Sequence, residues 1–258
     1  MNYWENYLEP VKYTDDIWYI GAKNAPSWLI KSTDGIILID TGMPQNLYQL
    51  VFNINKLGFC VDNIKHIIHS HGHIDHMGGT RALKELTGAK TYVGKGDVDM
   101  VKGLNQLQWT NEFNMKFEEP FEPDVIINDA DQITIGNKKF LFYSCPGHTA
   151  GTLSIFFNTI YNGKEYRAGM FGGAGLNSMK EDYMEKYNLP ASLREDFIKS
   201  LDRMSRENVD VHLGNHIQDC YHFEKLSLIK EIDNPFINPS SWNLFLDKKM
   251  AEAKAELK

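Results

Sequence analysis

The sequence predicts an α/β fold built in layers, and two observations support this prediction. Short apolar runs alternate with segments whose apolar residues recur at three- and four-residue steps, a pattern that indicates strands alternating with amphipathic helices. The 258 residues, of which 42% are hydrophobic, are enough to bury one large core. No internal repeat or low-complexity linker divides the chain. We therefore expect residues 1–258 to form a single domain.

The N-terminal half is predicted to begin with a hairpin. The apolar runs at residues 28–30 and 35–40 flank a turn-forming segment at residues 32–35. Pro44 can then open a helix, whose apolar residues repeat with helical spacing as far as the glycine stop at Gly58. The elements expected next are a strand at residues 64–68, a helix at residues 81–87 and a strand at residues 90–93.

Residues 94–123 form an irregular segment that carries several aromatic side chains. Long connections in compact domains often contribute to function, so Trp109, Phe113 and Phe117 are candidates for one wall of a substrate cleft. The alternative is that these aromatic side chains pack onto the core.

The C-terminal half is predicted to contain a second group of strands followed by helices. A Gly136-Asn137 turn joins two of these strands as a hairpin. The expected strands lie at residues 125–127, 132–135, 139–143, 152–157 and 166–171, and the expected helices lie at residues 191–206 and 242–258.

A dense group of potential metal ligands follows the strand at residues 64–68. His71, His73, Asp75 and His76 place three imidazoles and one carboxylate within six residues. Imidazole suits divalent zinc, and the carboxylate can serve a second ion, so this loop supplies part of a dinuclear site. Because each zinc usually needs three or four protein ligands, further ligands must come from elsewhere in the chain.

Two later histidines have a suitable context to complete these sites. His148 and His216 both lie in glycine-containing loops that follow strand-like runs. The remaining four histidines, His66, His69, His212 and His222, are expected to be structural or to face solvent.

These motifs together resemble those of the metallo-β-lactamase superfamily over most of the chain. They are His71-x-His73-x-Asp75-His76, Pro146-Gly147-His148-Thr149 and Gly214-Asn215-His216. The resemblance implies a four-layer αββα sandwich with two zinc ions per chain. It implies that His71, His73 and His148 hold the first zinc, and that Asp75, His76 and His216 hold the second.

The Asp40-Thr41-Gly42 turn resembles a turn that lies beneath the metal site in this superfamily. The resemblance implies that Asp40 supports a ligand histidine, since such histidines usually donate their second ring N–H to a carboxylate or a carbonyl. The alternative is that Asp40 is a simple turn aspartate.

The sequence also lacks a carboxylate that many members of the superfamily have. Thioester-cleaving hydrolases, lactonases and phosphodiesterases carry an aspartate that bridges the two metals, but residues 170–177 of this chain contain none. β-Lactamases share this absence. Because glycines rather than a cysteine stand at this point, the chain resembles the β-lactamase subclass with His-His-His and Asp-His-His zinc sites. Asn177 and Tyr221 are further candidates for substrate contacts.

The resemblance implies hydrolysis of the β-lactam amide by a metal-bound hydroxide that the catalytic residue Asp75 orients. One alternative is a related metallohydrolase, such as a lactonase, thioesterase or phosphodiesterase, that acts on a cytoplasmic metabolite. A second alternative is a metal-binding module without catalysis, although purely structural zinc sites are normally closed and single.

Charge and hydropathy narrow the set of expected partners. The net charge of -7, without a basic block, argues against nucleic acid. No apolar run approaches the roughly 20 residues that span a bilayer, so no membrane contact is expected. No export signal is visible, which predicts a cytoplasmic protein as written, or a periplasmic or secreted one if a leader has been removed. A small-molecule substrate is the expected partner, and the sequence predicts no oligomeric state.

Overall fold

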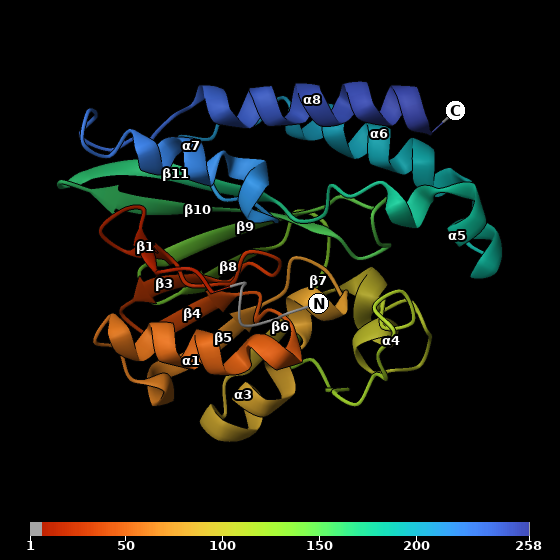
Figure 1. The fold of residues 1–258 in the computed structure, drawn as a ribbon, viewed down its shortest axis with the longest axis horizontal. Coiled ribbons are helices and arrows are strands. Elements are labelled where there is room, and N and C mark those ends of the chain that lie inside the picture. The colour runs from red at the N-terminus through yellow and green to blue at the C-terminus, as the bar shows by residue number, and fades with distance from the viewer. Residues whose placement is uncertain (1–6, 258) are drawn as a thin grey trace.

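The fold consists of two facing β-sheets with helices on both outer faces (Figure 1). The computed structural model describes residues 7–257. Helices α1 (Leu47–Lys56) and α3 (Thr80–Thr87) lie against the outer face of the first sheet. Helices α6 (Ser192–Met204) and α8 (Ser240–Glu256) lie on the outer face of the second, whereas α7 (His222–Ser227) packs through Leu226 against the cluster between the sheets. The predicted four-layer αββα sandwich is therefore confirmed.

The first sheet changes from antiparallel to parallel along its width. Strands β1 to β4 pair antiparallel, and β4 to β7 pair parallel. Parallel neighbours need a crossover connection, which α1 and α3 provide, and the carboxyl ends of β4, β5 and β6 consequently meet at one edge. In sheet order the strands are β1 (Val11–Lys12), β2 (Ile17–Tyr19), β3 (Trp28–Ser32), β4 (Gly35–Ile39), β5 (Ile64–Ile68), β6 (Lys90–Gly94) and β7 (Val125–Ile127).

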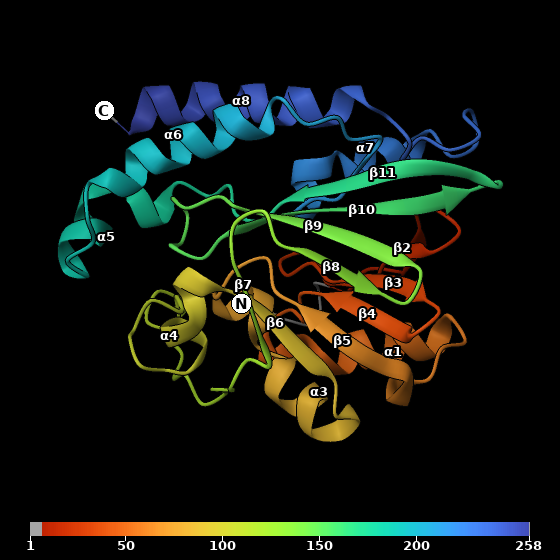
Figure 2. The same cartoon turned by 180° about the vertical axis from the view of Figure 1, so that it is seen from behind.

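The second sheet is antiparallel apart from its last pair. Strands β8 to β11 pair antiparallel in sequence order, and β12 pairs parallel with β11 (Figure 2). The strands are β8 (Gln132–Ile135), β9 (Lys138–Ser144), β10 (Leu153–Tyr161), β11 (Lys164–Phe171) and β12 (Val211–His212).

The core lies in three layers that follow from the alternation of side chains along the strands. On β4, Ile37 and Ile39 join the cluster between the sheets, whereas Leu38 joins the cluster under α1 and α3. On β10, Ile155 points between the sheets and Phe156 packs under α6 and α8. Strands that are buried on both faces therefore appear in the sequence as continuous apolar runs.

The structure adds short elements that the sequence analysis does not predict. These are β1, β2, α2 (Ile74–Met77), α4 (Val98–Val101), α5 (Glu181–Lys186) and α7, whereas β12 coincides with the strand-like run before His216. The expected helix at residues 44–58 begins with a 3₁₀ turn at Pro44–Asn46, and the C-terminal helix ends at Glu256. Lys258, the last residue of the expected helix, lies outside the described residues. Residues 1–6, at the start of the N-terminal segment in which no export signal is visible, also lie outside them.

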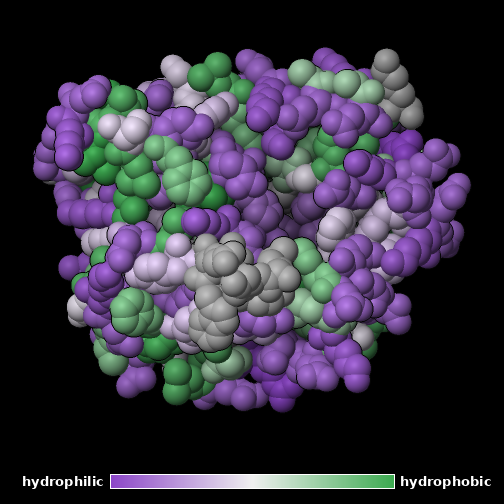
Figure 3. Space-filling model, in the orientation of Figure 1, coloured by the Kyte–Doolittle hydropathy of each residue, from purple (hydrophilic) through white to green (hydrophobic). Residues whose placement is uncertain are grey.

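Hydrophilic residues make up most of the face shown in Figure 3, and hydrophobic residues lie between them in small groups. Among residues 7–257, no helix has both the length and the apolar character that crossing a bilayer requires.

Candidate metal centre

The potential metal ligands lie in loops at one edge of the sandwich. His71 and His73 lie in the loop after β5, and Asp75 and His76 lie on α2 directly after it. His148 lies between β9 and β10, and the loop after β12 carries His216.

Within the described part of the chain, these six residues form two groups of three potential metal ligands. In each group the candidate ligand atoms lie within 4.8 Å of one another. The groups are His71, His73 and His148, and Asp75, His76 and His216. In the second group, Oδ2 of Asp75 lies 3.4 Å from Nε2 of His76 and 3.7 Å from Nε2 of His216. These are the two sets that the sequence analysis assigns to the two metals.

Hydrogen bonds fix the ring orientation of three of the histidines. Nδ1 of His71 lies 2.7 Å from the Gly172 carbonyl oxygen, and Nδ1 of His148 lies 2.7 Å from that of Gly175. Nδ1 of His76 lies 2.8 Å from Oδ2 of Asp40. Because each acceptor takes up the proton on Nδ1, Nε2 of each ring is the nitrogen that remains to bind a metal.

Asp40 connects two of the loops that carry these residues. Its carboxylate is fully buried and accepts hydrogen bonds from the backbone N–H of Ser70 at 2.8 Å and from the Ser70 hydroxyl at 2.6 Å, besides that from His76. The Asn215 side chain, next to His216, in turn donates to the Ser70 hydroxyl at 3.0 Å. The Asp40 side chain thus links the end of β4 to the loops that follow β5 and β12.

Burial keeps the histidines of the first group neutral. It lowers the pKa of His71 and His73 well below the usual range and that of His148 to about 4, and the neighbouring histidines add to the effect on His71 and His73. Neutral imidazole is the form that binds a metal. The first group is therefore in its ligand form at neutral pH.

The second group has a negative electrostatic character that suits a cation. Burial opposes a positive charge on His76, but Asp75 and Asp40 outweigh burial and raise its pKa to about 10. Burial also opposes the charge on Asp75, yet His76 and His216 hold the pKa of this carboxyl below its usual range. Nε2 of His76 is buried and has no hydrogen-bond partner among the described residues. An unpaired ring nitrogen beside an ionised carboxylate fits a divalent metal ion, and imidazole with carboxylate is a usual donor set for zinc.

The glycines after β11 pack directly against the first group. A Cβ on Gly173 would lie 2.6 Å from Cδ2 of His148, and a Cβ on Gly172 would lie 2.0 Å from the Leu153 carbonyl oxygen. No side chain fits at either position without displacing its neighbours. The absence of an aspartate at this strand end is therefore a packing requirement of this chain.

Asp97 is a buried residue that the sequence analysis does not identify as part of the site. Its carboxylate accepts hydrogen bonds from the backbone N–H groups of Gly72 and Gly151, both at 2.8 Å, and from the Thr149 hydroxyl at 2.7 Å. Burial raises the pKa of Asp97 to about 6 against these hydrogen bonds. Asp97 thus ties the loop of His71 and His73 to the loop of His148. The closely spaced glycines at positions 94 and 96, after a predicted strand, were the signal in the sequence for this close packing.

The predicted substrate-contact residues lie in different surroundings. The Trp109 ring centroid is 5.7 Å from that of His73, and Phe113 lies 6.1 Å from Trp109. Phe117 instead packs against a buried cluster that contains Met77 and Phe121. For Phe117, the alternative that the aromatic side chain packs onto the core is therefore the correct one. Asn177 is exposed in a 3₁₀ turn after the glycine segment.

Tyr221 is partly buried and packs against the apolar cluster under α6 and α8. It has a left-handed backbone, with φ of 56°, directly before α7.

The four histidines outside the two groups are all buried, so the solvent-facing alternative is wrong for them. His66 pairs with the Tyr92 hydroxyl and His69 with that of Thr80. His212 and His222 lie beside the hydroxyls of Ser241 and Tyr13, respectively.

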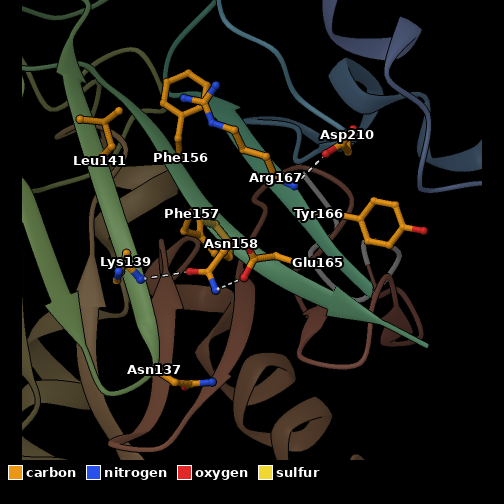
Figure 4. Close-up of a pocket in the computed structure, with 10 residues that line it drawn as sticks. All are labelled: Asn137, Lys139, Leu141, Phe156, Phe157, Asn158, Glu165, Tyr166, Arg167 and Asp210. Carbon is orange, nitrogen blue, oxygen red and sulfur yellow. Dashed lines mark hydrogen bonds between the residues drawn. The ribbon is translucent and has the colours of Figure 1, made fainter. Parts of the chain in front are cut away.

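A large hollow on the outer face of the second sheet lies apart from these groups. Figure 4 shows its lining on β9, β10 and β11, where Lys139, Asn158 and Glu165 form a chain of hydrogen bonds. It contains neither histidine nor cysteine. The chemistry that the sequence predicts therefore belongs to the two histidine-rich groups and not to this hollow.

Two solved metallo-beta-lactamases, of which the first is described as subclass B3, are similar to this chain over nearly its whole length. BJP-1 of Bradyrhizobium japonicum is 27% identical with a TM-score of 0.86, and the match covers 100% of this chain and 99% of that one. FEZ-1 from Legionella gormanii is 26% identical with a TM-score of 0.88, and the match covers 98% and 97%, respectively.

Similarity to curated sequences is more distant or more local. An uncharacterized protein of Aquifex aeolicus is 25% identical over 208 residues, which are 80% of this chain and 87% of that protein. A hydroxyacylglutathione hydrolase of Pelagibacter ubique is 30% identical over 95 residues, which are 37% of this chain and only 32% of that enzyme. Residues 20–159 match the family description "Metallo-beta-lactamase superfamily". The chain therefore belongs to the metallo-β-lactamase superfamily.

Proposed function

We propose that this protein is a dinuclear zinc hydrolase that opens the amide bond of β-lactam rings. The observation that carries the proposal is the combination of two complete ligand groups with a glycine segment that excludes a bridging carboxylate. The similarity to two metallo-beta-lactamases over nearly the whole chain, one of them of subclass B3, supports the same substrate class.

The proposed roles follow from the donor atoms. His71, His73 and His148 would hold one zinc ion, and Asp75, His76 and His216 would hold the other. When bound, the zinc ions supply Lewis acidity toward a carbonyl oxygen and lower the pKa of water toward neutrality.

The chain's own groups would position these ligands and the attacking water. Asp40, Gly172 and Gly175 accept the Nδ1 protons and so direct Nε2 of three histidines toward the metals. Oδ2 of Asp75 faces His76 and His216, which leaves its other oxygen to accept a hydrogen bond from the attacking water. Asp75 is suited to the role of hydrogen-bond acceptor for the attacking water, because His76 and His216 keep its carboxyl ionised.

Hydrolysis of a thioester or a lactone is the second candidate. It is favoured by the similarity to hydroxyacylglutathione hydrolases, although that similarity covers about a third of each chain. The packing of Gly173 on His148 weighs against it, because the bridging aspartate that the sequence analysis associates with such enzymes has no room there.

A substrate panel separates these candidates. Zinc-loaded protein is assayed with nitrocefin, a lactone, a thioester and a phosphodiester, before and after chelation and zinc readdition. We expect nitrocefin turnover that chelation abolishes and zinc restores. Asp75→Asn should lose most of this turnover, whereas Asp62→Asn, at an exposed aspartate in the turn before β5, should retain it. Turnover of the lactone or thioester with none of nitrocefin would favour the second candidate, and turnover that survives complete metal removal would overturn the proposal.

A further inference from the structure

His69 is a buried histidine beneath the second ligand group and belongs to neither group. It directly follows β5, two residues before His71, and none of its surface is exposed. Its backbone N–H donates to the Tyr92 carbonyl at 2.9 Å, which extends the pairing of β5 with β6. Burying an imidazole is costly unless its nitrogens find polar partners, and an aliphatic side chain would avoid this cost. The surroundings of the two ring nitrogens therefore indicate what His69 does.

Nε2 of His69 begins a chain of hydrogen bonds that ends at the backbone of a potential metal ligand. It lies 3.2 Å from the hydroxyl of Thr80, the first residue of α3, and this hydroxyl lies 2.9 Å from that of Thr41. Thr41 donates its backbone N–H to the His76 carbonyl at 2.7 Å and its hydroxyl to the same carbonyl at 3.2 Å. The chain thus connects the His69 ring to the start of α3 and to α2.

Nδ1 of His69 faces a carboxylate instead. This nitrogen is buried and has no hydrogen-bond partner among residues 7–257. It lies 4.0 Å from Oδ1 of Asp40, which is too far for a hydrogen bond but close enough for an electrostatic interaction. Both side chains are fully buried, so solvent screens this interaction only weakly. The other oxygen of the same carboxylate accepts the Nδ1 proton of His76.

These surroundings decide which ring nitrogen of His69 carries the proton. Burial outweighs the attraction of Asp40 and lowers the pKa of His69 to about 4, so the ring is neutral and has one N–H. The Asp40 carboxylate attracts a proton on Nδ1 and would repel a lone pair there. Nε2 can then accept the hydroxyl proton of Thr80. The tautomer with the proton on Nδ1 is therefore the one that suits both contacts.

We propose that His69 is a positioning residue for the second ligand group. Its Nδ1–H stabilises the ionised form of Asp40, and Asp40 fixes the ring of His76 so that Nε2 is directed toward the metal. A buried polar atom without a hydrogen-bond partner lowers stability, so a histidine at this place indicates a role beyond packing. The assignment rests on the proposed function, because it concerns how the chain prepares one of the two proposed zinc sites.

Packing alone is the competing explanation, and two amide variants separate it from the proposal. The amide of asparagine reaches about as far as Nδ1 of histidine, and that of glutamine about as far as Nε2. His69→Asn therefore keeps a donor toward Asp40, whereas His69→Gln keeps only the contact with Thr80. In a stepwise zinc titration, we expect His69→Gln to bind zinc at the second group at least about fivefold more weakly, and His69→Asn to stay within about twofold of the wild type.

Two further variants control this comparison. His69→Leu keeps an apolar contact with Phe121, whose ring centroid lies 5.3 Å from that of His69, but it removes both polar contacts. We expect His69→Leu to weaken zinc binding at the second group at least about fivefold, whereas a packing role would leave it unchanged. The matched control is His66→Gln, at another buried histidine of the same segment, which contacts the Tyr92 hydroxyl and should change neither site.

The tautomer of His69 gives a readout that does not depend on activity or on a variant that folds. Long-range proton–nitrogen correlation NMR of zinc-loaded protein with nitrogen-15 labelled histidine distinguishes a protonated from an unprotonated ring nitrogen. We expect the proton of His69 on Nδ1. A His69 ring with its proton on Nε2 would overturn the proposal, because Nδ1 could not then donate toward Asp40.

The outcomes separate this role from the proposed function. Zinc affinity at the second group that is equal in wild type and His69→Gln would overturn the positioning role and leave the function to be decided by nitrocefin turnover. An equal loss in His69→Asn and His69→Gln would overturn it as well, because only one of them removes the donor. A second zinc whose binding depends on His69 in the predicted way, without nitrocefin turnover, would support the positioning role and overturn the β-lactam assignment.

Discussion

Oδ2 of Asp40 accepts the Nδ1 proton of His76 at 2.8 Å, deep beneath the second ligand group. Asp40 has φ of 62°, so the turn after β4 holds a non-glycine residue in the left-handed region to place this carboxylate. Such conformations cost about 1–3 kcal/mol and persist where the surroundings stabilise them. Here the hydrogen bonds from Ser70 and His76 provide that stabilisation.

Replacing Asp40 should weaken the second metal site. In Asp40→Asn, the amide cannot accept all three hydrogen bonds, so we expect His76 to lose its fixed orientation and the protein to retain about one zinc per chain. Elemental analysis after dialysis measures this, with the exposed Asp62→Asn as the control that keeps both. Retention of two zinc ions in Asp40→Asn would show that the carboxylate does not position His76.

A side chain at Gly173 should disrupt the first site. The Cβ in Gly173→Ala would lie 2.6 Å from the His148 ring, so His148 must move and zinc affinity at the first group should fall at least about tenfold. Competition with a chromogenic chelator measures the affinity. Gly58→Ala is the matched control, since it carries a positive φ with nothing within 4 Å and should reduce only stability, by about 1 kcal/mol. Unchanged affinity in Gly173→Ala would contradict the packing argument.

Asp97 should act on metal binding through the loops that it joins. Asp97→Ala removes the acceptor for Gly72, Thr149 and Gly151, and we expect about a tenfold loss of zinc affinity, confined to the first group. Asp99→Asn, at an exposed position two residues along, is the control. Stepwise zinc titration of both variants separates the two groups. An equal loss at both would indicate general destabilisation instead.

His212 should make the protein less stable as the pH falls. Burial, and next the nearby Lys225, lower its folded-state pKa to about 3 from 6.5, so the unfolded chain binds the proton more readily. Its contribution to stability is complete above pH 6.5 and is lost as the pH falls toward 3, at up to about 1.4 kcal/mol per pH unit. Urea unfolding at pH 7.5, 6 and 5 measures this slope, which His212→Asn should flatten. Equal slopes in the two proteins would contradict the assignment.

The parts of the fold that the sequence predicts are those whose pattern is local. The run at residues 64–68 and the apolar spacing after Pro44 specify a strand and a helix without reference to the rest of the chain. The short strand β1 has no such pattern, because its two residues are defined as a strand by their pairing with β2. Helix α5 and the helical turn α4 are too short to show a clear apolar repeat.

The candidate site also has parts that the sequence predicts and parts that it does not. The six potential ligands carry recognisable chemistry within short motifs, and the structure brings them together in the two expected groups. Asp97 lies outside these motifs, and its hydrogen-bond partners come from segments distant in the sequence. Phe117 is a predicted cleft residue that packs on the core instead. The sequence could not distinguish the two, because an aromatic residue in an irregular segment looks the same whether it lines a cleft or packs on the core.

The zinc content of the purified, dialysed protein tests the central claim most directly. We predict two zinc ions per chain by elemental analysis, falling to about one in both His148→Ala and His216→Ala, because each histidine belongs to a different ligand group. One zinc or none in the zinc-replete wild-type protein would contradict a dinuclear centre.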